Sequence, residues 1–120
     1  MIGAGPAGLA CAWELKRAGV AVTVYEAEKK IGGVLTRTIP LYRFPEERIA
    51  RDAAWSLGGS GTVKLRLGER VIHPEALVRE YDAVFVAVGL SGVPPTWRGA
   101  ALRGVVSADA FLELTRARRY

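Results

Sequence analysis

The stretch Gly3-Ala4-Gly5-Pro6-Ala7-Gly8 decides the fold, because it fits the pattern G-x-G-x-x-G at the start of a predicted helix. In this pattern the first glycine permits a tight turn, the second lets the backbone approach a pyrophosphate, and the third allows a helix to pack closely on a strand. Free N–H groups and the positive end of the helix dipole then attract the negative phosphates. The stretch therefore predicts a turn that binds a dinucleotide.

An acidic residue follows at the position that a dinucleotide site requires. The segment Val20–Tyr25 is rich in β-branched residues and predicts a strand, which ends at Glu26. The carboxylate of Glu26 can accept hydrogen bonds from both ribose hydroxyls, and it would repel a 2′-phosphate. Because strand, turn, helix and acid are in register, we expect dinucleotide binding; a glycine-rich turn with a purely structural role is the alternative.

The remaining elements alternate in the order typical of a parallel sheet covered by helices. We expect helices over 6–18, 45–57 and 74–80 and from about 108 with Ser107 as its N-cap, strands over 20–25, 63–67 and 83–88, a loop through Gly32 and Gly33 to Pro40, and a turn at Pro94 and Pro95. The segment Ala83–Val88 is continuously apolar, which is typical of a strand buried on both faces. This order predicts an α/β fold, a Rossmann-like three-layer domain with a central parallel sheet.

Composition and charge exclude several function classes. Of the 120 residues, 50% are hydrophobic and 24% are charged, which is ordinary for a soluble globular domain. No apolar run approaches the roughly 20 residues of a membrane span, and no signal peptide is visible, so we expect a cytoplasmic chain without a membrane partner. The net charge of +5 comes mainly from arginines. Because no aromatic residues interleave with a basic stripe, we expect no nucleic-acid partner.

The residue types that could carry chemistry favour packing over catalysis. Cys11 is the single cysteine, which excludes an internal disulfide, a C-x-x-C redox pair and a cysteine-ligated cluster within the chain. His73 has no evident acid and nucleophile partners, and we interpret Trp13, Trp55 and Trp97 as packing or interface residues. We therefore predict no catalytic residue and no metal site, and any redox chemistry needs a bound cofactor.

Motifs further along the chain extend the glycine turn and Glu26 into a longer pattern. They are, in order, Gly32–Leu35, Ile39–Pro45, Tyr81–Gly89 and Gly104–Leu112. Taken together, they resemble the flavin-binding half of the glutamate synthase small subunit and the matching region of dihydropyrimidine dehydrogenase, in the pyridine nucleotide-disulphide oxidoreductase superfamily. The resemblance covers essentially all 120 residues and implies that the cofactor is FAD.

The resemblance also implies a role for individual residues. The residues of the glycine turn would wrap the pyrophosphate: Gly3, Ala4, Gly5, Pro6 and Ala7. Glu26 would bind the adenosine ribose, and Gly33 and Val34 would pass beside the flavin-side part of the cofactor with their backbone. Arg43 would reach toward the phosphates or the ribityl chain, and Val71 would contact the adenine through its backbone. The alternatives are an ordinary turn glycine at position 33, a solvated arginine at 43 and core packing at 71.

The function that the resemblance implies belongs to a larger protein. In that family electrons pass from NAD(P)H through FAD to an iron–sulfur or flavin partner, and the flavin performs the hydride chemistry. After Leu112 the chain has neither a second glycine fingerprint for NAD(P)H nor a segment that completes the FAD domain. Two residues precede Gly3, whereas a central parallel strand usually has about five. We therefore expect residues 1–120 to form a truncated FAD-binding domain, with NAD(P)H bound by a domain absent from this chain.

Two alternatives of a different kind stay open. Without an NAD(P)H domain, the chain could be a non-catalytic FAD- or nucleotide-binding module or fragment. An amine-oxidase-like FAD domain would be similar up to Gly32 and Gly33, but amine oxidases commonly follow that pair with arginine, and Val34 stands here. The stretch at 39–45 also has no counterpart in that class.

Overall fold

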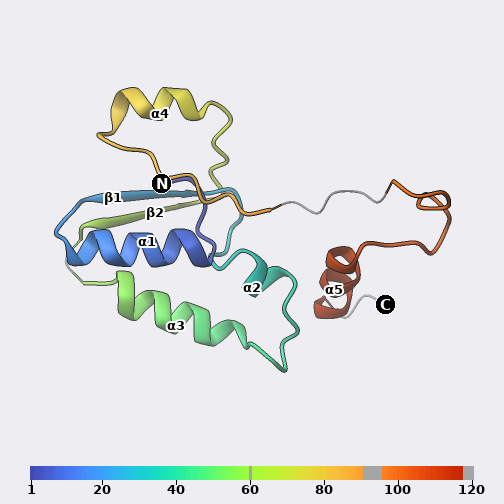
Figure 1. The fold of residues 1–120 in the computed structure, drawn as a ribbon. Helices are drawn as coiled ribbons and strands as arrows, with labels where there is room; N and C mark the ends of the chain where they lie inside the picture. The colour runs from blue at the N-terminus through green and yellow to red at the C-terminus, as the bar shows by residue number, and fades with distance from the viewer. Residues whose placement is uncertain (60, 91–95, 118–120) are drawn as a thin grey trace.

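The computed structural model describes residues 1–59, 61–90 and 96–117 and has a parallel sheet at its centre (Figure 1). Strand β1 (Val22–Glu26) pairs in parallel with β2 (Val63–Leu67) along its whole length. On the other side of β1, Ile2 forms parallel bridges with Tyr25 and with Val86. The order across the sheet is therefore β2, β1, Ile2 and Val86, which is the order of the first four strands of a Rossmann fold. This order confirms the predicted α/β architecture.

Helices cover both faces of the sheet. Helices α1 (Pro6–Arg17) and α3 (Glu46–Leu57) lie on one face and α4 (Pro74–Glu80) on the other, which gives the predicted three layers (Figure 1). Proline occupies the first turn of α1, and the helix stops before Gly19, which has a φ of +77°. The predicted ends of these helices are confirmed to within one residue. None of the described helices combines the length and the apolar character needed to cross a bilayer.

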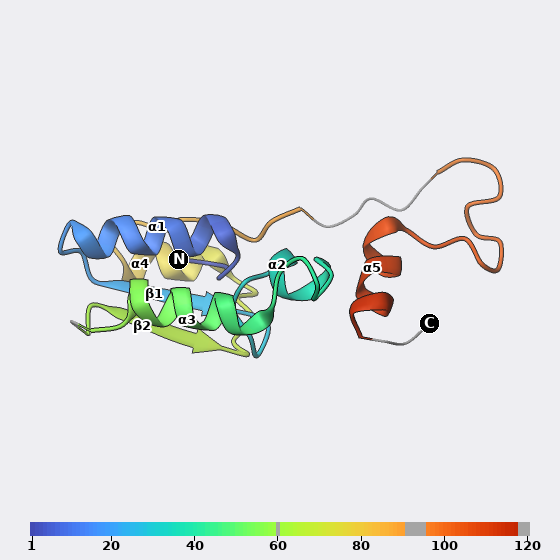
Figure 2. The same ribbon diagram turned by 90° about the horizontal axis from the view of Figure 1, so that it is seen from below.

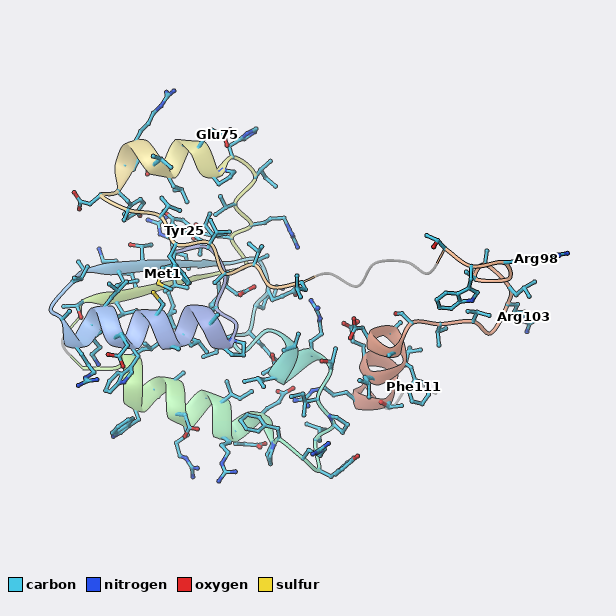
Figure 3. The ribbon with its side chains drawn as sticks, in the orientation of Figure 1. Met1, Tyr25, Glu75, Arg98, Arg103 and Phe111 are labelled. Carbon is cyan, nitrogen blue, oxygen red and sulfur yellow. The ribbon has the colours of Figure 1, made fainter. Side chains whose placement is uncertain are left out.

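The core lies between the sheet and α1. It is formed by Met1, Ala4, Ala12, Val22, Val24 and Leu57. A Cβ atom on Gly8 would collide with the carbonyl oxygen of Gly3, so this glycine lets α1 approach the strand end closely, as expected for the third glycine of the pattern. On the opposite face of the sheet, the hydroxyl of Tyr25 lies 3.0 Å from that of Tyr81 (Figure 3).

The predicted buried strand over Ala83–Val88 is wrong in extent and in burial. Its pairing is confined to a bridge between Val86 and Ile2, in which the Ile2 N–H donates to the Phe85 carbonyl at 2.9 Å. The neighbouring segment is short, because the chain turns into the glycine loop directly after Ile2. A longer ladder therefore does not form among the described residues. The side chains of Phe85, Val86 and Val88 are 44%, 59% and 70% exposed. They are exposed because no layer of the described part of the chain covers them.

Two further boundaries differ from expectation. Strand β1 begins at Val22 rather than at residue 20, because the Val20 N–H still closes the end of α1 by donating to the Leu15 carbonyl at 2.9 Å. The loop expected at 32–40 contains the one-turn helix α2 (Val34–Arg37). Thr36 supports this turn, since its hydroxyl donates to two preceding carbonyl oxygens at 3.1 Å.

Helix α5 (Ala108–Arg116) lies beyond the end of the sheet and beside α2 (Figures 1 and 2). Ser107 caps it as predicted, because its hydroxyl accepts a hydrogen bond from the Ala110 N–H at 3.2 Å. The radius of gyration of 16.7 Å exceeds the value of about 14 Å expected for a compact chain of this length, because residues 96–117 form a projecting arm. The predicted Pro94–Pro95 turn lies outside the described residues.

Candidate nucleotide-binding site

The glycine turn joins Ile2 of the sheet to the N-terminus of α1. Gly3 has a φ of +102°, a conformation that favours glycine. A Cβ atom at this position would also collide with the carbonyl oxygen of Ala87. The turn therefore passes between Ile2 and the segment around Val86, where the strand order reverses, and open α/β sheets bind their ligands at such a reversal.

The N-terminus of α1 presents backbone donors that have no partner within the helix. Gly5 is the N-cap residue, Pro6 begins the first turn, and no side chain of a described residue caps this end. The first turn, which includes the exposed Ala7, carries no acidic residue. A Cβ atom on Gly5 would meet its nearest described neighbour, the Cα of Gly33, at 4.0 Å. The N–H groups and the helix dipole are thus open to an anion.

The carboxylate of Glu26 points toward this turn from the end of β1, where the residue is 8% exposed. Its Oε2 accepts a hydrogen bond from the Ala4 N–H at 2.7 Å, and its Oε1 accepts one from the Glu28 N–H at 2.8 Å. Because each carboxylate oxygen has two acceptor positions, Glu26 can still accept bonds from ligand hydroxyls. The fold thus brings the predicted acid into direct contact with the predicted turn.

The Gly32–Gly33 pair packs against the glycine turn. The Gly32 N–H donates to the carbonyl of Ala4 at 2.8 Å. Gly33 has a φ of +53°, and a Cβ atom there would lie 3.1 Å from the Cα of Gly5. Val34 begins α2 and is 45% exposed. The backbone of Gly33 is therefore brought to the turn, and Val34 lies at the surface next to it.

A groove of about 520 Å³ extends from the end of β1 past α2. The backbone of Gly33 and five charged side chains line it: Glu28, Lys29, Lys30, Arg37 and Glu46. The Nζ of Lys30 lies 2.8 Å from Oε2 of Glu46. This hydrogen bond, with a smaller contribution from Arg116, holds the pKa of Glu46 below its ordinary value, so Glu46 is ionised at neutral pH.

The charged lining of the groove is not among the site residues expected from the sequence. The run Glu28–Lys30 directly follows Glu26. It could have been recognised, because ligand sites of parallel sheets form at the carboxyl ends of strands. Arg37 and Glu46 join the groove through α2 and the start of α3. No local pattern predicts the helical turn of α2, so nothing in the sequence places Arg37 and Glu46 beside the groove.

Arg43 and Val71 lie outside the residues that line the groove. Arg43 is exposed in a turn closed by its N–H, which donates to the Pro40 carbonyl at 2.9 Å. No described contact joins it to the glycine turn. Val71 is half-buried and follows Glu69, whose N–H donates to the Glu26 carbonyl at 2.9 Å. Val71 therefore stays near the Glu26 end of the sheet.

Known proteins share this sequence pattern. Residues 1–74 match the protein-family model of the NAD(P)-binding Rossmann-like domain. The chain is 40% identical over 91 residues to the glutamate synthase (NADPH) small chain of Escherichia coli, a match that covers 74% of this chain and 19% of the relative. It is 38% identical over 120 residues to the same small chain of Mycobacterium tuberculosis, covering 93% and 23%. The NADP(+)-dependent formate dehydrogenase subunit beta of Moorella thermoacetica is 44% identical over 92 residues, covering 75% and 13%.

These similarities confirm the resemblance to the glutamate synthase small subunit that the motifs indicate. The chain spans between 13% and 23% of the length of these relatives. The matched segment contains the glycine turn, Glu26 and both strands of the described sheet. The chain therefore belongs to the NAD(P)-binding Rossmann-like domain family.

Proposed function

We propose that the chain is the FAD-binding part of an NAD(P)H-dependent oxidoreductase, in which electrons pass from NAD(P)H through FAD to an iron–sulfur or flavin partner. The observation that carries this proposal is the hydrogen bond of 2.7 Å between Oε2 of Glu26 and the N–H of Ala4. It holds a carboxylate suited to a ribose beside a turn suited to a pyrophosphate. The adenosine diphosphate half of a dinucleotide requires this pairing.

The residues present fit the adenosine diphosphate half of FAD. The uncapped N-terminus of α1 offers N–H donors to a pyrophosphate, and the open space at Gly5 leaves room for it. The groove of about 520 Å³ lies within the usual range of ligand sites, about 300–1,000 Å³. Three cationic and two carboxylate side chains line it, so that its lining carries one net positive charge. Size, shape and charge therefore support a nucleotide as the ligand.

Within this proposal the chain binds and orients the cofactor. The turn Gly3–Ala7 holds the pyrophosphate, Glu26 the ribose, the backbone of Gly33 and Val34 the flavin side, Val71 the adenine, and Arg43 the phosphates or the ribityl chain. When bound, the flavin supplies the hydride and electron-transfer chemistry. We name no catalytic residue, because orientation and electrostatics are the contributions of the protein.

A larger assembly is part of the proposal. The relatives are named as a small chain of glutamate synthase and as a subunit beta of a formate dehydrogenase. These names support a partner subunit. In our proposal residues 1–120 are the FAD-binding domain, a separate domain binds NAD(P)H, and a partner domain or subunit accepts the electrons. The cytoplasmic location expected from the sequence stays a prediction.

Replacing Gly5 with alanine tests the proposal. Gly5→Ala should fold, because a φ of −74° and a ψ of −176° suit alanine, but the new methyl group would occupy the space of a pyrophosphate. We expect FAD binding, followed by the quenching of flavin fluorescence, to weaken at least about tenfold. Ala10→Ser is the control, since it adds one heavy atom at an exposed position of α1 beyond the first turn and keeps an ordinary helical backbone. Equal FAD affinity of Gly5→Ala and the unchanged protein would refute the turn as the site.

A second candidate is the binding of a nicotinamide nucleotide by the same turn, which the matching family model favours. Glu26 would then accept NADH better than NADPH, because its carboxylate repels a 2′-phosphate. Titrations of one preparation with FAD, NADH and NADPH separate the two candidates. Tightest binding of FAD supports our proposal, and tighter binding of NADH than of FAD supports the second candidate.

A further inference from the structure

Two charged side chains of α5 contact residues that line the groove. Figure 1 shows α5 beside α2. The Oε1 of Glu113 lies 2.7 Å from the Nε of Arg37. The Nη2 of Arg116 lies 3.4 Å from Oε1 of Glu46, and its Nη1 donates to the carbonyl oxygen of Ile39. Because Arg37 and Glu46 both line the groove, α5 reaches two charged groups of the site from far along the chain.

The side chain of Arg116 is buried to an unusual degree for an arginine in this molecule. It is 6% exposed, whereas the ion-paired side chains of Arg17 and Arg66 are 61% and 50% exposed. Its Nε has no hydrogen-bond partner among the described residues. A guanidinium group is costly to bury unless a charge pairs with it, so the contact with Glu46 stabilises Arg116 where it lies.

Arg116 and Glu113 of α5 have opposite effects on the charge that the groove presents to a ligand. The carboxylate of Glu46 is held between Lys30 at Oε2 and Arg116 at Oε1. Without Arg116, Lys30 would be the remaining cation at this carboxylate among the described residues, and Glu46 would repel an anionic ligand more strongly. Glu113 engages Arg37, a groove cation that could otherwise pair with a phosphate.

We infer that α5 sets the affinity of the groove for a phosphate-bearing ligand, because Arg116 raises this affinity by neutralising Glu46 and Glu113 lowers it by engaging Arg37. Both are positioning residues, since they act through residues of the groove. The inference rests on the proposed function, because the groove meets the glycine turn at Gly33, and its charges therefore act on the phosphates that the turn is proposed to hold. It goes further in assigning a regulatory task to the arm of residues 96–117.

Calorimetric titration of the full chain with ADP at low ionic strength tests this inference. Arg116→Ala should weaken ADP binding about five- to tenfold, and Glu113→Gln should tighten it about two- to fivefold. If α5 merely supported the fold, both substitutions would weaken binding, so the opposite directions are the decisive result. Glu14→Gln and Arg17→Ala are matched controls, because this ion pair has the same residue types and spacing on α1. They should leave the ADP affinity within about twofold of the unchanged protein.

Removal of the Glu46 carboxylate gives a second, independent readout. In the Glu46→Gln background Arg116→Ala should no longer weaken ADP binding, because the charge that Arg116 neutralises is absent. Arg116→Lys should retain most of the affinity, since it keeps a cation at this place. If Arg116→Ala fails to fold, Glu113→Gln and Glu46→Gln decide, because both should bind ADP more tightly than the unchanged protein.

Two outcomes overturn the inference while the proposed function survives. One is an ADP affinity that Glu113→Gln leaves unchanged or lowers. The other is a double variant of Arg116 and Glu46 that binds as weakly as Arg116→Ala alone. If the unchanged protein binds neither ADP nor FAD, the proposed function itself fails, and the inference fails with it.

Discussion

Glu26 accepts hydrogen bonds from two backbone N–H groups that belong to different parts of the chain, Ala4 in the glycine turn and Glu28 beyond β1. A carboxylate suits this position because both of its oxygens are acceptors. The residue thereby joins the turn to the strand end and leaves acceptor positions for a ribose. At the scale of a single residue, the proposed site makes stability and ligand binding depend on the same side chain.

Replacing Glu26 with glutamine should therefore lower both the free energy of unfolding and the affinity for FAD. The amide keeps one acceptor oxygen and turns its NH₂ group toward the other backbone N–H, so we expect the free energy of unfolding to fall by about 1–3 kcal/mol. FAD binding should weaken as well. Urea unfolding and a fluorescence titration measure the two effects, with Glu80→Gln at the exposed end of α4 as the control. An unchanged FAD affinity would remove Glu26 from the site.

At the scale of an element, the N-terminus of α1 has no side-chain cap from a described residue. Gly5 occupies the N-cap position, and the first turn contains no acidic residue. A serine, threonine or aspartate cap would stabilise a helix by about 1 kcal/mol. The uncapped end leaves the N–H donors and the dipole of the helix for an external anion, as a phosphate-binding helix requires.

An aspartate in the first turn of α1 should separate helix stability from ligand binding. In Ala7→Asp the new charge meets the positive end of the dipole, and we expect the free energy of unfolding to rise by about 0.3–1 kcal/mol. The same charge would repel a pyrophosphate, so ADP binding should weaken about threefold or more. Thermal unfolding and titration measure the two effects. Ala7→Asn, which adds the same bulk without the charge, should weaken ADP binding less than Ala7→Asp, and equal losses in the two variants would point to a steric effect.

At the scale of the whole molecule, the sheet has an apolar edge. The segment at 85–88 meets Ile2 through one bridge, and the side chains of Val86 and Val88 are largely exposed. Exposed apolar edges promote association between chains. This edge also borders the glycine turn, because the carbonyl of Ala87 lies against Gly3. We therefore expect the surface beside the site to promote association between copies of the chain.

A charge on this edge should reduce self-association. We expect Val88→Lys to lower the concentration-dependent increase in apparent mass measured by light scattering, while the free energy of unfolding changes by less than about 0.5 kcal/mol. Val78→Lys on α4 is the control, since Val78 is 65% exposed and lies outside the edge. Equal association of Val88→Lys and the unchanged protein would show that the edge does not mediate contacts between chains.

The sequence by itself determined the glycine turn, the bounds of α1, α3 and α4, and the acid at the end of β1. These features follow from local rules, because residue spacing, proline and glycine preferences and alternation act within a few residues of each other. The same local rules predicted the cap at Ser107. They misjudged the apolar run at 83–88, because its burial depends on which layers cover it.

The tertiary structure alone decided how the charged groove is built. Arg116 reaches Glu46 across 70 positions of the chain and Ile39 across 77. A periodic pattern within a short window of residues cannot predict a contact between residues so far apart in the sequence. Glu113 reaches Arg37 in the same way. Local patterns specify which segments become helices and strands, whereas packing brings distant charges together, and the charge of the proposed site is set by that packing.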